Sequence, residues 1–384
     1  MLSRRLFLLG SGSVALSSVL SGCESASDLS IAILEGSLPN QLITNIKQES
    51  AKLGIVKLKP ESTLEKLYQS LLTQQEKTIN KTINNLNNNF QKSTHQLSII
   101  GNNQTEIKKQ DLTTLGNYWL PFAIENELID PLDLKILENW SKLSPLFQKL
   151  VTRNNQGKLD NQDQIWGAPY RWGYTMIAYR EDKFQNLGWQ PQDWGDLWKP
   201  EIKHRFSLLN QPREVIGLVL KKLGYSYNTK NLKQITNLLQ ELQTLNQQVK
   251  FYDSRNYLQP LILGDTWLAV GWSTDIIPLI ERYHNIKAVI PISGTSLWAD
   301  IWVKPRSQSS ELEKIYNWID FCWQSKSARQ ISLFSSGISP VETSFSEINR
   351  QIPLISPEVL AKSEFIEPLE SQFFAEYEKI WTQL

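Results

Sequence analysis

Aromatic rings and carboxylates lie next to several of the strands that the sequence predicts. Each of four predicted strands has such residues near one end: Tyr118; Gln211 and Glu214; Trp272 and Asp275; Trp298 and Asp300. An alkyl-ammonium ligand needs this mixture, because rings cover its methylene groups and attract its charge, at about 2 kcal/mol or more per desolvated contact. Carboxylates offset the cost of dehydrating the ammonium group. No nucleophile–base pair stands among these residues, so the pattern predicts binding of a cationic amine.

Each of these residues also has a structural interpretation. Pro212 is suited to the first position of a helix, which would place Glu214 at the third position, where a carboxylate caps free backbone N–H groups. A single Trp more often packs in a core than lines a ligand site. Asp300 could cap a turn, and Tyr118 could pack against Trp119. The binding hypothesis therefore depends on all of these residues converging in one place.

The elements that must bring them together alternate between strands and helices. Strands are predicted at 29–34, 56–58, 111–115, 205–209, 267–271, 288–291 and 301–304, with amphipathic helices between them. This order predicts an α/β fold with parallel sheets covered by helices. In such sheets, ligands bind beyond the carboxyl ends of the strands. The interleaving predicts two lobes with the chain crossing between them more than once.

The central stretch Ile165–Arg180, IWGAPYRWGYTMIAYR, is expected to carry the backbone from one lobe into the other. We accordingly expect residues 23–165 to form the first part of lobe 1 and residues 166–297 to belong mainly to lobe 2. Residues 298–384 are expected to return to lobe 1 and to end in helices. The Asn-rich stretch at 80–90 has few apolar residues and is expected to be a surface insertion without a function.

Composition excludes several classes of function. The formal net charge is +1 and the charges form no basic patch, so we expect no nucleic-acid partner. The three histidines have no metal-ligand spacing, and we predict no metal site and no cofactor. Cys322 lies in an apolar stretch and is expected to be a small buried residue.

The first residues have the organisation of an export signal. Arg4 and Arg5 precede a modest apolar run that ends in small residues, and Cys23 follows Leu20-Ser21-Gly22. The arginine pair resembles a twin-arginine signal, and the segment ending at Cys23 resembles a lipoprotein box. Residues 1–22 are thus expected to be removed, leaving a periplasmic protein held to the membrane by lipid on Cys23. The alternative is an uncleaved N-terminal anchor.

Five ordered blocks resemble the bacterial periplasmic spermidine/putrescine-binding proteins, the solute receptors of polyamine ABC transporters. The blocks are DLTTLGNYW, IWGAPYRWGYTMIAYR, WGDLWKPEIKHRFSLLNQPREVIGLVLKKLGYSYNT, LILGDTWLAVGWSTD and SLWADIWVKP. The resemblance implies a monomeric, two-lobed, hinge-bending receptor that is not an enzyme and that delivers a small amine to a permease. By position, it implies amine contacts from Glu214 and Asp300, and aromatic contacts from Tyr118, Trp272 and Trp298.

The chain departs from this family at several positions. Gln211 stands where the family has an acid, and Gly116 where it has a polar residue. The aromatic pair expected after the first strand is replaced by a segment that contains Glu35, and a tyrosine expected near Ile338 is absent. Loss of one carboxylate should weaken a long polyamine more than a shorter or less charged amine. Glu35 could restore a negative charge from the first lobe.

Two other functions remain open from the sequence. An exported hydrolase could use Glu214 with Asp300 or Asp275 as an acid/base pair, although no G-x-S-x-G, HExxH, Gly-rich phosphate loop or Cys–His pairing is present. A receptor for another solute, such as ferric ion, would need clustered Tyr, His or carboxylate ligands. The tyrosines are scattered along the chain, and the tryptophans would then have no role.

Overall fold

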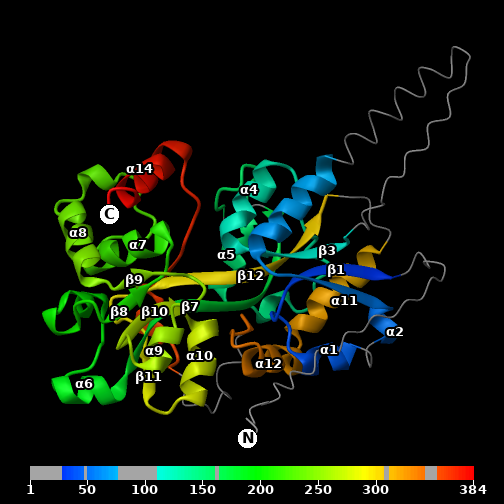
Figure 1. Ribbon diagram of the computed structural model, residues 1–384. Coiled ribbons are helices and arrows are strands. Elements are labelled where there is room, and N and C mark those ends of the chain that lie inside the picture. The colour runs from blue at the N-terminus through cyan, green and yellow to red at the C-terminus, as the bar shows by residue number, and fades with distance from the viewer. Residues whose placement is uncertain (1–27, 47–49, 77–109, 161–163, 307–310, 342–352) are drawn as a thin grey trace, which may run out of the picture.

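The structure is a computed structural model that describes residues 28–46, 50–76, 110–160, 164–306, 311–341 and 353–384. Arg4, Arg5 and Cys23 of the predicted export signal lie outside these residues, as does the Asn-rich stretch at 80–90. The predicted fold class is confirmed: strands and helices alternate along the chain, and helices flank a large mixed sheet (Figure 1). No helix in the described part of the chain combines the length and apolar character that a membrane span requires.

The strands are short except for two. Their bounds are β1 (Leu29–Leu34), β2 (Val56–Glu61), β3 (Leu112–Gly116), β4 (Ile129–Asp130), β5 (Thr152–Arg153), β6 (Gln164–Ile165), β7 (Ala168–Arg180), β8 (Phe206–Leu208), β9 (Phe251–Tyr252), β10 (Leu268–Trp272), β11 (Ile286–Val289), β12 (Ser296–Pro305) and β13 (Glu364–Phe365). β7, with 13 residues, and β12, with 10, are each long enough to run through both halves of the molecule.

The helices fill the intervals between these strands. Their bounds are α1 (Asn40–Ile46), α2 (Ser50–Leu53), α4 (Leu120–Glu125), α5 (Pro145–Val151), α6 (Glu181–Leu187), α7 (Pro212–Lys222), α8 (Leu238–Gln248), α9 (Gln259–Leu263), α10 (Ser273–Arg282), α11 (Leu312–Trp323), α12 (Ser325–Phe334), α13 (Pro357–Leu360) and α14 (Ser371–Trp381). Residues 64–76 are also helical, and a 3-10 turn, Asn117–Trp119, follows β3.

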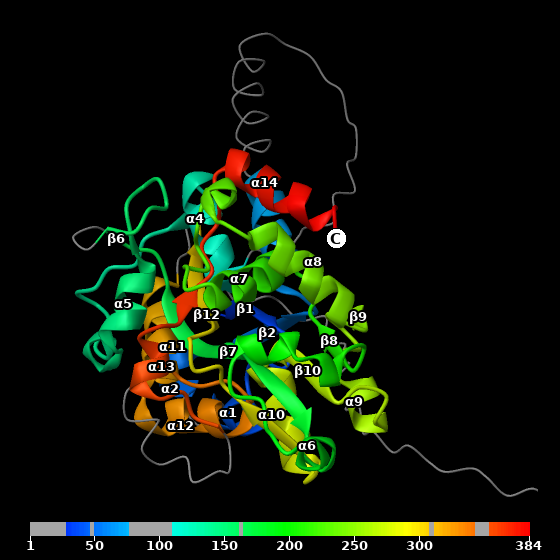
Figure 2. The ribbon, with the colours of Figure 1, turned by 90° about the vertical axis from the view of Figure 1, so that its left-hand side faces the viewer.

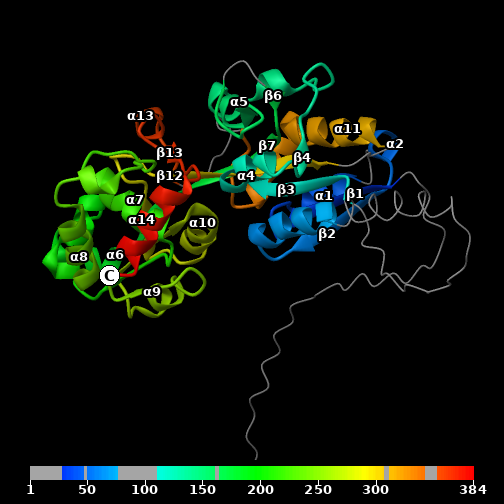
Figure 3. The same cartoon turned by 90° about the horizontal axis from the view of Figure 1, so that it is seen from above.

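The strand order is β2-β1-β3-β12-β7-β10-β8-β9. β1 pairs in parallel with β2 and β3 in the first lobe, and β8 pairs in parallel with β9 and β10 in the second. β12 runs antiparallel to β3 and β7, and β7 runs antiparallel to β10. The two long strands therefore join a lobe containing β1–β3 to a lobe containing β8–β10, as the view from above shows (Figure 3).

Two clusters of buried apolar residues hold this arrangement together. The larger runs from β1 and β3 through α11 and α12, along β7 and β12, to the α10 side of the second lobe. The smaller fills the opposite side of the second lobe, between its strands and helices α7 and α8. Helix α14 packs against α7 in this smaller cluster, so the last helix of the chain belongs to the second lobe (Figure 2).

Candidate functional site

A cavity of about 660 Å³ lies between the two lobes. The first lobe contributes Leu34, Tyr118 and Trp119, the second lobe contributes Gln211, Arg255 and Trp272, and the two crossing strands contribute Arg171, Trp298 and Asp300. Five of the seven residues predicted to bind ligand therefore meet at one cavity: Tyr118, Gln211, Trp272, Trp298 and Asp300. Glu214 and Glu35 are not among the residues that line it.

One face of β12 presents residues that lie two positions apart. Ser296, Trp298 and Asp300 share this face because successive side chains of a strand point to opposite sides. Antiparallel pairing places Gly173 of β7 opposite Trp298 and Arg171 opposite Asp300. Directly opposed residues in an antiparallel pair have side chains on the same face. The register thus decides what each site residue touches.

The Trp298 ring lies over Gly173. A Cβ atom at position 173 would come within 2.3 Å of Cζ2 of Trp298 and 2.4 Å of Oγ of Ser273. Real Cβ atoms essentially never approach other atoms this closely, so the absence of a side chain at 173 is what allows the ring to lie against the sheet. Trp298 remains partly exposed at the cavity.

Arg171 and Asp300 form an ion pair inside the cavity wall. Nη2 of Arg171 lies 2.6 Å from Oδ2 of Asp300, and Nε donates to the same oxygen at 2.8 Å. The two side chains are only 7% and 1% exposed, respectively. The guanidinium also lies 5.5 Å from the centre of the Trp298 ring. Asp300 is therefore not a free carboxylate, and sequence reasoning did not assign a role to Arg171.

Glu214 has a different set of partners. It stands in the first turn of α7, but its carboxylate accepts hydrogen bonds from side chains of β7 and β12 and from no backbone N–H group of the described residues, so the capping interpretation is wrong. Ser296 Oγ donates to Oε2 at 2.7 Å, and Thr175 Oγ1 lies 3.2 Å from both carboxylate oxygens. Burial raises the pKa of Glu214, and hydrogen bonds from Ser296, Thr175 and Trp272 act against that shift.

The remaining predicted residues lie at the edges of this site. Tyr118 contacts Trp119 edge-to-face with ring centres 5.7 Å apart, so it both packs and lines the cavity. Gln211 is exposed at the start of α7, and Glu35 is exposed after β1. Asp275 accepts a hydrogen bond from the Tyr257 hydroxyl at 2.7 Å and does not line the cavity. A binding role for Glu35 and Glu214 stays a prediction.

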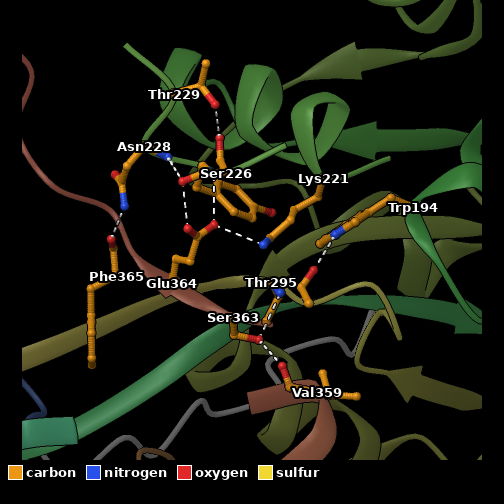
Figure 4. A network of polar contacts seen from close by, with 12 residues as sticks. Trp194, Lys221, Ser226, Asn228, Thr229, Thr295, Val359, Ser363, Glu364 and Phe365 are labelled. Carbon is orange, nitrogen blue, oxygen red and sulfur yellow. Dashed lines mark hydrogen bonds and ion pairs between the residues drawn. The ribbon is translucent and has the colours of Figure 1, made fainter. Parts of the chain in front are cut away.

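The C-terminal segment forms polar contacts with both lobes. Glu364 pairs with Lys221 at 3.0 Å and accepts hydrogen bonds from Ser226 Oγ and the Tyr227 N–H (Figure 4). Glu367 pairs with Arg153 of the first lobe through both carboxylate oxygens. Its carbonyl oxygen accepts a hydrogen bond from Arg213 of the second lobe at 3.0 Å. We call residues 364–370 the strap, because they connect the lobes beside the two long strands.

The acidic side chains at and behind the cavity wall are bound by other groups of the protein. No group of three or more His, Cys, Asp or Glu side chains that could hold a metal ion occurs within the described ranges. The carboxylates of Glu214, Asp275 and Asp300 bind hydroxyl, phenol and guanidinium groups of the protein, respectively. The geometry offers aromatic surface and charged hydrogen-bond donors to an organic ligand.

The sequence and the fold both match known solute receptors. The sequence model of one family, described as "Bacterial extracellular solute-binding protein", matches residues 108–356. The spermidine/putrescine-binding periplasmic protein of Escherichia coli is 29% identical over 223 residues, which cover 58% of this chain and 61% of that protein. The counterpart from Salmonella typhimurium is 27% identical over the same length. This chain therefore matches about three fifths of each of these two relatives.

Among solved structures, the spermidine/putrescine ABC transporter substrate-binding protein of Streptococcus pneumoniae aligns with a TM-score of 0.74. It is 20% identical, and the alignment covers 93% of this chain and 98% of that chain. At this identity the likeness shows a common fold: two lobes of the periplasmic-binding-protein type.

Proposed function

Because the chain belongs to the bacterial extracellular solute-binding protein family, we propose that it is the solute receptor of an ABC importer. Its ligand is an organic amine of the polyamine-like class, bound in the cavity between the lobes. The names of the matched relatives, which are binding proteins for spermidine and putrescine, support this ligand class. As the receptor of an importer, the protein would deliver this amine to the permease.

The observation that carries the proposal is the convergence of Tyr118, Trp272 and Trp298 on one cavity from three separate parts of the chain. Aromatic faces attract an ammonium group and cover the alkyl chain that bears it. A cavity of about 660 Å³ falls in the range of sites for small organic molecules. Nothing in the geometry favours a hydrolase, since Glu214, Asp300 and Asp275, the acids that a hydrolase was expected to use, are each held by a partner within the protein.

Ligand that touches both lobes would favour the form in which the lobes lie close together. Tyr118 belongs to the first lobe and Trp272 to the second, so an amine between them interacts best when both rings are near. This is a shift between two populations of the protein, and the permease would recognise the closed one.

Export and anchoring complete the proposal. The twin-arginine-like signal with Arg4 and Arg5 would direct the chain to the periplasm, and lipid on Cys23 would hold it to the membrane. The receptor is proposed to be a monomer. Labelled fatty acid should be incorporated into the wild-type protein in cells and not into Cys23→Ser. Label in both proteins, or in neither, would remove the lipid anchor.

A thermal-shift screen tests the ligand class. Putrescine, spermidine, 4-aminobutanoate and n-butylamine should be compared with sugars, anions and divalent metal ions. At least one amine should raise the melting temperature in a concentration-dependent way, because ligand that binds only the folded state stabilises it. If no amine does so while the protein is folded, the amine receptor is excluded.

A further inference from the structure

The charges around the cavity do not suit a ligand that carries ammonium groups alone. Among the described residues that line it, Arg171 and Arg255 are cationic and Asp300 is the only carboxylate. Asp300 is already paired with Arg171 at 2.6 Å. A diamine would therefore bring two positive charges to a wall that has no unpaired carboxylate and two guanidinium groups.

The acids outside the cavity wall do not reverse this balance. Glu214 is held by Ser296 and Thr175, and burial raises its pKa. Asp275 accepts a hydrogen bond from Tyr257 and stands at the start of α10. Neither lines the cavity. Glu214 and Asp275 can attract one ammonium group of a ligand through space. Among the described residues of the cavity wall, no carboxylate is then available for a second ammonium group at the other end of the ligand.

Arg171 has hydrogen-bonding capacity to spare. A guanidinium group has five N–H donors. Nε and one N–H of Nη2 are used by Asp300, and one N–H of Nη1 is used by the Ser335 carbonyl oxygen at 3.2 Å. Five donors less three leaves two, one on each terminal nitrogen, without a partner in the described part of the chain. The two terminal nitrogens of a guanidinium group can together bind a carboxylate through both of its oxygens.

We propose that the amine taken by this cavity also carries a carboxylate, which Arg171 binds through its two remaining N–H groups. The aromatic rings cover the alkyl chain, and the ammonium end lies toward Trp272 and Tyr118. Asp300 holds the guanidinium in place and is a positioning residue. The inference rests on the proposed function, and it narrows the ligand from polyamines to amino acids with an amine at the end of an alkyl chain.

Three ligands of equal chain length test this on the wild-type protein. Putrescine, n-butylamine and 4-aminobutanoate share one ammonium group on a four-carbon chain and differ at the other end. Isothermal titration calorimetry should show 4-aminobutanoate binding at least tenfold more tightly than the other two. If putrescine, n-butylamine or spermidine binds as tightly as 4-aminobutanoate, the inference is overturned and the amine receptor stands. If no amine binds, the proposed function itself fails.

Variants of Arg171 test whether this residue causes the preference for 4-aminobutanoate. Arg171→Gln should weaken 4-aminobutanoate at least tenfold and leave putrescine unchanged or tighter, because Asp300 is released to bind ammonium. The double variant with Asp300→Asn removes both charges together and keeps the test usable if the single change prevents folding; it should lose the preference for 4-aminobutanoate over n-butylamine. Arg205→Gln is the matched control, since its guanidinium lies over Trp267 and does not line the cavity. Retention of the preference in both Arg171 variants would overturn the assignment.

Discussion

The guanidinium of Arg171 lies 2.6 Å from the carboxylate of Asp300, and the two residues stand directly opposite each other on β7 and β12. Both strands run from one lobe into the other, so this pair sits where the lobes join. It also lines the cavity. A carboxylate that the sequence predicts as an ammonium ligand is thus bound to a cation of the protein itself.

Gly173→Ala should displace the Trp298 ring. A Cβ at this position would lie 2.3 Å from Cζ2 of the ring, so the ring or the strand must move. Overpacking of this kind costs about 1–3 kcal/mol of unfolding free energy, and it should also weaken amine binding because Trp298 lines the cavity. Urea unfolding and calorimetry measure the two effects. Gly195→Ala is the control, since nothing lies within 4 Å of a Cβ there; similar losses in both variants would contradict the packing argument.

Glu214 should make stability depend on pH in the acidic range. Burial raises its pKa in the folded protein above the ordinary value of 4.5. A carboxyl group of this kind contributes stability that is fully present below pH 4.5 and is lost as the pH rises through the raised pKa.

Glu214→Gln removes this titration. The unfolding free energy of the wild type, minus that of the variant, should therefore fall as the pH rises above 4.5. Urea unfolding of both proteins at a series of pH values gives this difference. A difference that stays constant would show that Glu214 has the same pKa in the folded and unfolded states, and one that rises with pH would show that the fold favours the ionised form. Either result would contradict a raised pKa.

Glu367→Gln should loosen the strap. The side chain of Arg153 is 1% exposed and that of Glu367 is 25% exposed, so the variant leaves a buried guanidinium without its charged partner. Hydrogen bonds to charged groups contribute about 1.5–3 kcal/mol each, and we expect a loss of about 2 kcal/mol in urea unfolding. Glu370→Gln serves as the control, because Glu370 and Lys230 are 60% and 59% exposed and the change should have no measurable effect. Equal stability of the two variants would mean that the ion pair between Glu367 and Arg153 does not contribute.

Much of the fold could be predicted from the sequence, because the apolar periodicity of several strands and helices is clear within each element. The predicted strand 29–34 coincides with β1, and α7 begins at Pro212, the residue that the sequence indicated for the first position of a helix. The predicted strand 301–304 is too short, since β12 begins at Ser296. Trp298 and Asp300 therefore lie within a strand and not ahead of one. Element boundaries depend on pairing partners far away in the chain, which a local pattern does not contain.

The dependence on distant pairing partners also explains why the contact between Arg171 and Asp300 could not be predicted from the sequence. Tyr118, Trp272 and Trp298 were assigned from residue type and family resemblance, and all three line the cavity. An arginine within the apolar stretch at 165–180 was a signal that a buried acid must lie nearby. Only the register of β7 against β12 identifies that acid as Asp300. Likewise, Glu214 was expected to cap α7 or to meet ligand, and its hydroxyl partners come from β7 and β12.

The most direct test of the account is the affinity of the amine identified by the screen for wild type, Trp298→Ala and Trp189→Ala. Trp298 lines the cavity, whereas Trp189 lies in the second lobe with Lys199 over its ring. Loss of the aromatic surface that Trp298 offers to the alkyl chain of the ligand, about 2 kcal/mol, should weaken binding roughly thirtyfold in Trp298→Ala, and Trp189→Ala should bind as the wild type does. Unchanged binding by a folded Trp298→Ala protein would show that the amine does not occupy the cavity between the lobes.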